Sequence, residues 1–344
     1  MLLLNYRPVL RQPTGIGVYA NGVLQALLGL PHVLIPGGEE GTAQQRLKRL
    51  SWTQFEMPRL AKRHGASLIF TPAPEGYLGS QVIPQVVMVH DLRPISYPER
   101  SLQSMYFRAF VPPLLRKARH VLTNSRFTAR QIQRCTGLSA EKITVIPLGY
   151  ETEVFRPAPL SLESKERPYL LNVGQAYPHK NLKRLIHAFA QVVQHQPCVR
   201  LVLAGKPHAN ESRQLQLLVA ELGLQHRVEF RPYVPYTELP DLYRGALALV
   251  YPSLYEGFGL PVLEAMACGT PVITSEGSGT EEVAGDAALL VDPVDVDALR
   301  SAILDIIYQQ ALRDQCRIKG LQRASQFNWE ATGVATRNVL AAMS

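Results

Sequence analysis

Short apolar runs alternate with longer amphipathic segments along the chain. The runs are rich in Leu, Val and Ile, which is typical of strands buried on both faces of a parallel sheet. The longer segments repeat their apolar positions with helical spacing. In the first half this pattern predicts strands at residues 2–4, 67–70, 86–89, 121–124 and 143–146, and helices at residues 18–28, 45–63, 100–118 and 126–135.

A polar segment bounded by prolines, residues 157–168, is the predicted linker to a second series of the same kind. Two such series predict an α/β fold with two Rossmann-like, doubly wound domains that face a cleft, at residues 1–157 and 168–328. The second series has predicted strands at residues 169–173, 200–204, 228–230, 246–251, 272–274 and 288–291, a helix at 182–193 and a terminal helix at 329–343.

Residues 251–272, YPSLYEGFGLPVLEAMACGTPV, predict a strand end, a glycine-containing turn and a helix. The helix runs from Leu260 to residue 267, with Pro261 in its first turn, and stops before Gly269. The first turn of such a helix presents backbone N–H groups to which an anion can bind. Gly257 and Gly259 lack a Cβ atom and allow a ligand to approach the main chain.

Two acids flank this predicted anion site. Glu256 lies in the turn, and Glu264 follows about two helical turns later. Carboxylates accept hydrogen bonds from hydroxyl groups, so the arrangement fits a nucleoside diphosphate sugar, in which a diphosphate joins two polyols. The alternative is an ordinary helix of an α/β domain whose acid balances the helix dipole.

The loop 174–181, GQAYPHKN, carries a second candidate for phosphate binding. Lys180 stands at a predicted helix start, where a cation opposes the helix dipole and is often retained for an anion. Gly174 begins the loop, and Arg184 follows one turn into the helix as a possible second cation. The alternative for Lys180 is a solvent-exposed side chain without a ligand.

Two further candidates lie at the carboxyl ends of strands in the first half, where doubly wound domains bind ligands. Gly15 and Gly17, in a predicted loop, would let a phosphate or sugar approach the backbone, although most such turns are only turns. His90, followed by Asp91, ends a buried strand and is either a ligand group or a core histidine.

Residues 256–264 resemble the Glu-x7-Glu signature of retaining glycosyltransferases of family four, which have the GT-B fold. The resemblance extends over nearly the whole chain and is strongest from residue 169 to 293. It implies that Glu256 contacts hydroxyls of the donor sugar, that Glu264 holds the ribose, and that the terminal helix, residues 329–344, crosses back to the first, acceptor-binding domain. The amides implied to bind the diphosphate are those of Gly257, Phe258 and Gly259.

The same resemblance extends to the candidates outside this stretch. The loop 174–181 is similar to the phosphate loop of the family, with Gln175 where many members have arginine, which leaves Lys180, helped by Arg184, as the main counter-charge. His90 falls where the family presents a histidine to the donor sugar. We therefore assign His90, Lys180 and Glu256 as catalytic residues.

Within the family, VHDL, TNSRFTARQI and VGQAYPHKNLKRLIHAF look most like bacterial mannosyltransferases of polysaccharide and O-antigen assembly. This implies transfer of a sugar to a glycan or polyprenyl-linked acceptor with retention of configuration. GDP-mannose is the first donor expected, with UDP- and ADP-sugars as alternatives. The departing phosphate is expected to accept the proton of the acceptor, and we expect neither a metal nor a cofactor besides the donor.

Charge is unevenly distributed along the 344 residues, which have a net charge of +8. Residues 1–160 contain 19 Lys and Arg against 9 Asp and Glu (+10), whereas residues 161–344 contain 17 against 19 (−2). The excess indicates an anionic partner for the first half, such as a membrane surface or lipid phosphate. Nucleic acid is disfavoured because no groove-reading motif occurs.

The predicted helix 45–63 concentrates part of this charge. Basic residues stand among Leu47, Trp52 and Phe55, which fits a helix lying on a membrane surface. A helix packed on the core with a solvated basic face is favoured over this, because an internal helix needs its apolar side for the fold, and Pro58 is expected to interrupt it.

The remaining composition favours a cytoplasmic protein, with peripheral contact to the inner face of the membrane as an option. Four scattered cysteines, without metal-ligand spacing, indicate reduced thiols. No apolar run is long enough to span a membrane, and residues 2–4 are too short for a signal peptide, although their abrupt start suggests a trimmed sequence.

Two other functions stay open from the sequence. The first is another enzyme of the same architecture, such as a sugar-nucleotide epimerase or a phosphorylase, whose pyridoxal cofactor would absorb light. The second is a non-catalytic subunit of a glycan-assembly complex, against which the intact Glu256, Glu264, His90 and Lys180 speak.

Overall fold

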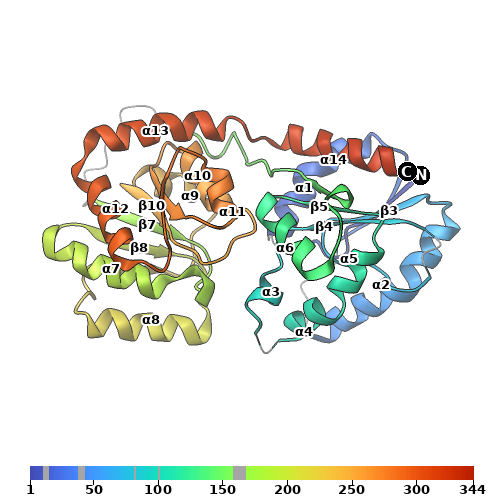
Figure 1. Ribbon diagram of the computed structural model, residues 1–344, viewed down its shortest axis with the longest axis horizontal. Coiled ribbons are helices and arrows are strands. Elements are labelled where there is room, and N and C mark those ends of the chain that lie inside the picture. Colours follow the sequence, from blue (N-terminus) through green and yellow to red (C-terminus); the bar gives the residue numbers. More distant parts are fainter. Residues whose placement is uncertain (11–14, 38–42, 81–82, 100, 158–167) are drawn as a thin grey trace. The chain divides into compact units, whose positions relative to one another are not determined.

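The computed structural model describes residues 1–10, 15–37, 43–80, 83–99, 101–157 and 168–344. The chain forms two compact units, the first made of residues 1–149 and 327–344 and the second of residues 150–326 (Figure 1). Most of the predicted linker, residues 158–167, lies outside the described residues. Residues 150–157 pack with the second unit, since Phe155 contacts the ring of Tyr243 and Arg244 donates to the carbonyl of Arg156.

The first unit is a six-stranded parallel sheet in the order β2-β1-β3-β4-β5-β6. Its central strands are buried along their whole length, as their continuous apolar runs predict. The edge strand β2 was not predicted, although it contains the short apolar run Val33 to Ile35; this run lies between Pro31 and Pro36, and its residues are only partly buried or exposed. The strands are β1 Leu2–Asn5, β2 His32–Ile35, β3 Leu68–Thr71, β4 Gln85–Val89, β5 His120–Thr123 and β6 Ile143–Val145.

The helices of this unit correct three sequence predictions. The expected loop at Gly15 and Gly17 is instead the first turn of a helix. Pro58 does not interrupt its helix. The single helix expected at residues 100–118 is two, because Pro112 lacks an N–H group and starts a new helix after Phe110. The helices are α1 Gly15–Leu28, α2 Ala43–Arg63, α3 Arg93–Ser96, α4 Leu102–Ala109, α5 Val111–Lys117, α6 Arg126–Thr136 and α14 Trp329–Met343.

The terminal helix α14 returns to the first unit, as predicted, and packs against α1 (Figure 1). Glycines make the close approach possible, since a Cβ atom on Gly22 would lie 2.4 Å from the ring of Trp329 and one on Gly333 would lie 2.8 Å from Ala26. The hydroxyls of Tyr19 and Thr336 lie 3.4 Å apart across the helix pair.

The second unit is also a six-stranded parallel sheet, in the order β12-β11-β10-β7-β8-β9. Its predicted strands and the helix at Leu182–His195 are confirmed. The strands are β7 Tyr169–Val173, β8 Arg200–Ala204, β9 Val228–Arg231, β10 Ala248–Tyr251, β11 Val272–Ser275 and β12 Leu289–Val291. The helices are α7 Leu182–His195, α8 Ala209–Glu221, α9 Leu239–Arg244, α10 Leu260–Ala267, α11 Gly279–Ala284, α12 Val296–Tyr308 and α13 Gln310–Ala324.

The strand order of the second unit determines where a ligand can bind. β7 and β10 are neighbours, but the chain continues from β7 toward β8 on one side and from β10 toward β11 on the other. The loops that leave the carboxyl ends of these two strands therefore diverge and leave a crevice, the usual ligand position in a doubly wound sheet. In the described part of the chain, no helix has the length and apolar character needed to cross a bilayer.

Candidate active site

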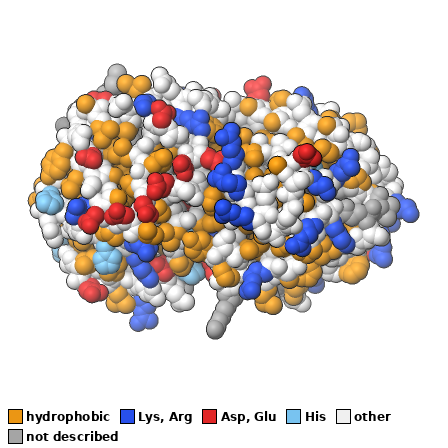
Figure 2. Space-filling view, in the orientation of Figure 1, with side chains coloured by type: hydrophobic (Ala, Val, Ile, Leu, Met, Phe, Trp, Pro, Cys, Tyr) orange, Lys and Arg blue, Asp and Glu red, His pale blue; other side chains and the backbone are white. Residues whose placement is uncertain are grey.

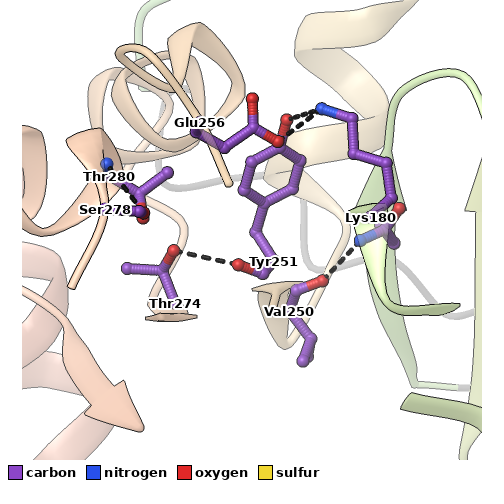
Figure 3. A network of polar contacts seen from close by, with 8 residues as sticks. Lys180, Val250, Tyr251, Glu256, Thr274, Ser278 and Thr280 are labelled. Carbon is purple, nitrogen blue, oxygen red and sulfur yellow. Dashed lines mark hydrogen bonds and ion pairs between the residues drawn. The ribbon is translucent and has the colours of Figure 1, made fainter. Parts of the chain in front are cut away.

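Three side chains meet at the carboxyl ends of β7 and β10. The ammonium of Lys180, from the loop after β7, lies 2.6 Å from a carboxylate oxygen of Glu256 and 2.5 Å from the hydroxyl of Tyr251, the last residue of β10 (Figure 3). The same ammonium lies 4.8 Å from the centre of the Tyr251 ring. We call Lys180, Glu256 and Tyr251 the lysine cluster.

Burial and charge pairing act against each other in the lysine cluster. The side chains of Lys180 and Glu256 are only 13% and 14% exposed. Burial disfavours the ammonium, but the carboxylate of Glu256 and the hydroxyl of Tyr251 outweigh it and raise the pKa of Lys180. Burial likewise disfavours the carboxylate, but the ammonium of Lys180 outweighs it and lowers the pKa of Glu256. Both groups therefore stay charged at neutral pH.

The ammonium keeps a hydrogen available for a ligand. An ammonium has three N–H donors, and the two described contacts of Lys180 occupy two of them. The third can donate to an anionic oxygen while the carboxylate holds the lysine in place.

Asn181 positions Lys180 by joining the two diverging loops. It precedes α7 in a left-handed conformation with φ of 61°. Its side-chain amide donates to the carbonyl of Pro252, 3.0 Å away, and to that of Pro293, 2.6 Å away. Arg184, predicted to assist Lys180, donates to the side-chain oxygen of Asn181 at 2.9 Å, and its part in binding an anion stays a prediction. Arg184 therefore supports the loop, and Lys180 carries the positive charge of the lysine cluster.

Gly174, the first residue of the loop after β7, lies against Lys180. Its φ of +143° is disfavoured for other residues, and a Cβ atom there would lie 3.6 Å from Cε of Lys180. Glycine is thus required by the backbone conformation rather than by lack of space.

The glycine-containing turn before α10 packs against the start of α11. Gly259 has φ of +107°, and a Cβ atom on it would lie 2.6 Å from a methyl carbon of Thr280. A Cβ atom on Gly279 would lie 2.3 Å from the carbonyl oxygen of Gly257, and the Gly279 amide donates to the Glu256 carbonyl at 2.9 Å. The first turns of α10, which starts at Leu260, and α11 are therefore held close together, beside the lysine cluster (Figure 3).

Phe258 in this turn is 5% exposed, so its side chain anchors the turn in the core. The side chain of Ser278 accepts from the amide of Thr280 and begins α11. The start of α11 thus packs on the turn that carries Glu256, the partner of Lys180. The first turn of α10 and the ammonium of Lys180 each favour a bound anion.

Glu264 belongs to a separate hydrogen-bonding group. It accepts from the hydroxyl of Tyr243, in α9, at 2.8 Å. Burial raises the pKa of Glu264 to about 7, although the bond from Tyr243 lowers it in part. Glu256 and Glu264 thus differ in protonation. Glu256 is a carboxylate paired with the ammonium of a lysine, whereas Glu264 gains and loses its proton near neutral pH.

We expect Glu264 to make stability depend on pH. Its pKa is raised on folding, so its stabilising contribution is complete below the ordinary glutamate pKa of about 4.5 and is lost as the pH rises through about 7. Replacing it, Glu264→Gln, should flatten the fall in the free energy of unfolding between these values. Urea unfolding across the pH range measures this, with the exposed Glu221→Gln as control. A slope in Glu264→Gln equal to that of wild type would contradict the assignment.

His90 lies in the first unit, at the end of β4. Its Nε2 lies 3.0 Å from the carbonyl oxygen of Pro72, and its ring meets the ring of Tyr19 edge to face at 5.1 Å. Burial lowers the pKa of His90 to about 4, so the imidazole is neutral at pH 7. Because a carbonyl only accepts, Nε2 carries the proton, and Nδ1 has a lone pair for a hydroxyl donor.

Gly15 and Gly17 begin the helix that carries Tyr19, and therefore stand on the element that contacts His90. Gly15 has open space at its Cβ position. Gly15 and Gly17 thus lie in the first turn of a helix and not in the loop that the sequence predicted.

A pocket of about 250 Å³ adjoins the lysine cluster at the carboxyl ends of β7, β8 and β9. It extends from Gly174 to the loops after β8 and β9. Its lining includes Gly174, Ala176, Gly205, Pro207, Arg231 and Pro232. The pocket has mixed polar and apolar walls, which suit a planar heterocycle with a polar edge.

The described residues contain no group of three His, Cys, Asp or Glu side chains able to hold a metal ion. An Asp-x-Asp pair, Asp295 and Asp297, lies at the start of α12. There Asp295 accepts from the amides of Asp297 and Ala298, both at 2.9 Å. Asp295 therefore caps the helix, and Asp297 pairs with Arg300 at 3.0 Å.

Sequence reasoning missed two tyrosines of the site. Tyr251 accepts from Lys180, the partner of Glu256, and Tyr243 donates to Glu264. Both are fully buried, so their hydroxyls need partners inside the protein. Tyr251 ends a buried strand, and a tyrosine in that position was an available signal. Tyr243 gave no such signal, because its helix α9 has only six residues.

Comparisons with known proteins identify the family of the chain. Residues 159–323 match the family model described as glycosyl transferases group 1, and residues 14–154 match the model described as glycosyltransferase family 4. O-antigen chain mannosyltransferase B of Escherichia coli is 33% identical over 276 residues, which are 77% of this chain and 72% of that protein.

A second relative and a solved structure give the same result. O-antigen chain mannosyltransferase RfbU of Salmonella typhimurium is 37% identical over 225 residues, 64% of this chain and 60% of that protein. The crystal structure of Anabaena Alr3699/HepE in complex with UDP-glucose superposes with a TM-score of 0.78 at 20% identity, covering 99% of this chain and 100% of that one. The chain thus belongs to the group 1 glycosyl transferases of family 4, is similar to O-antigen mannosyltransferases, and has the GT-B fold.

Proposed function

We propose that the protein transfers mannose from GDP-mannose to a hydroxyl of a glycan or lipid-linked acceptor, with retention of the anomeric configuration and without a metal. The lysine cluster carries this proposal, because it holds a charged ammonium beside the turn that leads into α10 and packs against the start of α11. A diphosphate is the anion that such an arrangement suits, since several of its oxygens can bind at once.

The reaction builds negative charge on the phosphate oxygen that leaves the anomeric carbon. Lys180 and the helix dipoles are already in position when this charge develops, which is the most effective form of electrostatic stabilisation. The ammonium also replaces part of the charge that a divalent metal supplies in other phosphate sites. The leaving phosphate then accepts the proton of the acceptor hydroxyl.

Glu256 is unsuited to act as a nucleophile. Its carboxylate is bound to the ammonium of Lys180 and has a lowered pKa, both of which reduce its nucleophilicity. We therefore propose attack of the acceptor on the same face as the departing diphosphate, with Glu256 and Glu264 binding donor hydroxyls. His90, neutral and with a lone pair on Nδ1, is proposed to accept from a hydroxyl of the transferred sugar.

The pocket beside Gly174 is proposed to hold the nucleoside base. Mannose and GDP are preferred because two relatives are named as mannosyltransferases, while the UDP-glucose complex of a structural neighbour keeps a UDP-sugar as the second candidate. The acceptor is proposed to be membrane-borne, which fits the basic charge of the first unit.

Release of nucleoside diphosphate from GDP-mannose, UDP-glucose and ADP-glucose, each with a glycan acceptor and with a chelator present, tests the function. We expect GDP to be released from GDP-mannose only when the acceptor is present, at a rate that the chelator does not change. NMR should show an α-linked product. Sugar inversion without transfer would indicate an epimerase. Absence of release from all donors would contradict the proposal and favour a non-catalytic subunit.

A further inference from the structure

The loop after β1 carries an arginine that the candidate active site does not use. Arg7 lies two residues after the end of β1 and is partly buried, between the buried Tyr6 and Pro8. Its guanidinium carbon lies over the ring of Trp52, in α2, at 4.4 Å from the ring centre. Among the residues that the structure describes, the guanidinium has no hydrogen-bond or ion-pair partner.

A partly buried cation without an acid beside it is costly, because it has lost part of its hydration and gained no opposite charge. The negative face of the Trp52 ring offsets some of this loss. A guanidinium has five N–H donors in its plane, in a fork that matches the oxygens of a phosphate. Arg7 therefore presents the donors that an oxyanion needs.

Acids are scarce in the first unit, so its cations far outnumber their possible partners. It contains 19 Lys and Arg against 8 Asp and Glu, and Lys and Arg side chains predominate over its elements on the side drawn in Figure 2. Three of the acids already pair with other arginines, namely Glu56 with Arg59, Glu75 with Arg49 and Glu99 with Arg93. The opposite charge for Arg7 is thus expected to come from a ligand.

The backbone holds Arg7 in a fixed turn. The amide of Val9 donates to the carbonyl of Tyr6 at 2.8 Å and closes the turn that contains Arg7. The hydroxyl of Tyr6 donates to the carbonyl of Ala20, in α1, at 3.0 Å. A Cβ atom on Gly37 would lie 2.4 Å from the carbonyl oxygen of Val9, so the chain after β2 packs closely on the same turn.

The helix α2, which supplies Trp52, is fixed to the loop after β3. Arg49 pairs with Glu75 at 2.7 Å, and Gln54 donates to the carbonyl of Gly76 at 2.8 Å. The ring that supports the guanidinium is therefore held in place before any ligand arrives. A side chain that is already positioned loses less conformational entropy when it binds.

Arg7 lies on the same edge of the sheet as His90. β1 and β3 are neighbours, and the chain leaves them toward opposite sides, so the loops after them diverge as those after β7 and β10 do. The side-chain amide of Asn5 donates to the hydroxyl of Thr71 at 3.3 Å, and Pro72 then accepts from His90 at 3.0 Å. Only β3 separates β1 from β4, and two strand spacings amount to roughly 10 Å.

We propose that Arg7 binds a phosphate of the acceptor, in the ester or diphosphate that links an acceptor sugar to its carrier. This inference rests on the proposed function, because it assigns a group of the acceptor in the same transfer. The acceptor sugar then lies between Arg7 and His90, which is proposed to contact the transferred sugar. The anions of the acceptor and of the donor thus have separate cations, Arg7 and Lys180.

Titration calorimetry without a donor tests this subsite separately from sugar transfer. The probes are octyl mannoside and mannosyl octyl diphosphate, which differ only in the diphosphate, and inorganic pyrophosphate. We expect wild type to bind the diphosphate probe at least about tenfold more tightly than the mannoside. Arg7→Gln should lose most of this preference, and Arg7→Lys, which keeps the charge but not the fork, should retain part of it.

Two controls identify the group that binds the diphosphate. Arg63→Gln removes a positive charge from an exposed residue in the last turn of α2 and should match wild type. Lys180→Gln with Glu256→Gln removes the charges of the lysine cluster and should also keep the preference. If this double variant lost the preference while Arg7→Gln kept it, the diphosphate would lie in the donor site and the proposal would be wrong. Pyrophosphate binding as tight as that of the mannosyl probe would also overturn it, since Arg7 would then hold free phosphate.

Transfer from GDP-mannose to the two mannosides separates this inference from the proposed function. At an unchanged melting temperature, Arg7→Gln should raise the KM of the diphosphate acceptor and leave that of octyl mannoside as in wild type. Transfer by Arg7→Gln with a wild-type KM for the diphosphate acceptor would contradict the subsite alone. Binding through Arg7 without transfer to either mannoside would contradict the proposed function alone.

Discussion

Replacing Lys180 with glutamine is expected to lower sugar transfer by about 100- to 1,000-fold, the usual effect of removing one preorganised donor to a developing negative charge. Lys180 supplies the ammonium of the lysine cluster, and Arg184 is already committed to Asn181. Initial rates of nucleoside diphosphate release measure the effect. Lys183→Gln, at an exposed lysine three residues further on in the first turn of α7, should leave the rate unchanged.

A double variant separates the chemical effect from loss of stability. Lys180→Gln leaves the Glu256 carboxylate without its partner, and we expect it to destabilise the protein by about 3 kcal/mol. Lys180→Gln with Glu256→Gln removes both charges, so most of that stability should return while transfer stays low. If the double variant recovered transfer together with stability, the ammonium would have only a structural role.

Replacing Gly279 with alanine is expected to have the second largest effect. The new methyl group would lie 2.3 Å from the carbonyl oxygen of Gly257 and 2.7 Å from that of Glu256, and both neighbours are backbone atoms that cannot rotate away. The two helix starts must separate, and the bond from the Gly279 amide to the Glu256 carbonyl must lengthen. We expect a loss of about 1–3 kcal/mol of unfolding free energy and a strong fall in transfer, measured by urea unfolding and initial rates.

Gly79 provides the control for this substitution. It is exposed, and a Cβ atom there would have no neighbour within 4 Å. Gly79→Ala should therefore match wild type in both measurements. Equal stability and activity of Gly279→Ala and wild type would show that the contact between the starts of α10 and α11 is not needed.

The sequence predicted the elements whose residues are buried along their whole length. The runs at β4 and β10 are continuous and apolar, and their strands form as expected. The half-buried edge strand β2 has only the three-residue apolar run Val33 to Ile35, which lies between two prolines, and it was missed. The effect of a proline on a helix was also hard to predict from the sequence. Pro112 begins a new helix, whereas Pro58 lies within α2 and does not end it.

For the site, sequence motifs identified residues but not their partners. The pairing of Lys180 with Glu256 joins positions 76 residues apart, and only the adjacency of β7 and β10 brings them together. The bonds of Asn181 to the carbonyls of Pro252 and Pro293 likewise join distant loops, so they could not be predicted from the sequence. The role of α11 was missed because Gly279 follows β11, whereas the turn that it contacts, residues 256–259, follows the neighbouring strand β10.

Calorimetric titration of wild type and Lys180→Gln with GDP and with guanosine tests most directly whether the lysine cluster binds a diphosphate. For wild type we expect GDP to bind at least tenfold more tightly than guanosine, about 1.4 kcal/mol, and for Lys180→Gln we expect most of this difference to disappear while guanosine binding is retained. Equal preference for GDP in both proteins would contradict the claim that Lys180 holds the diphosphate.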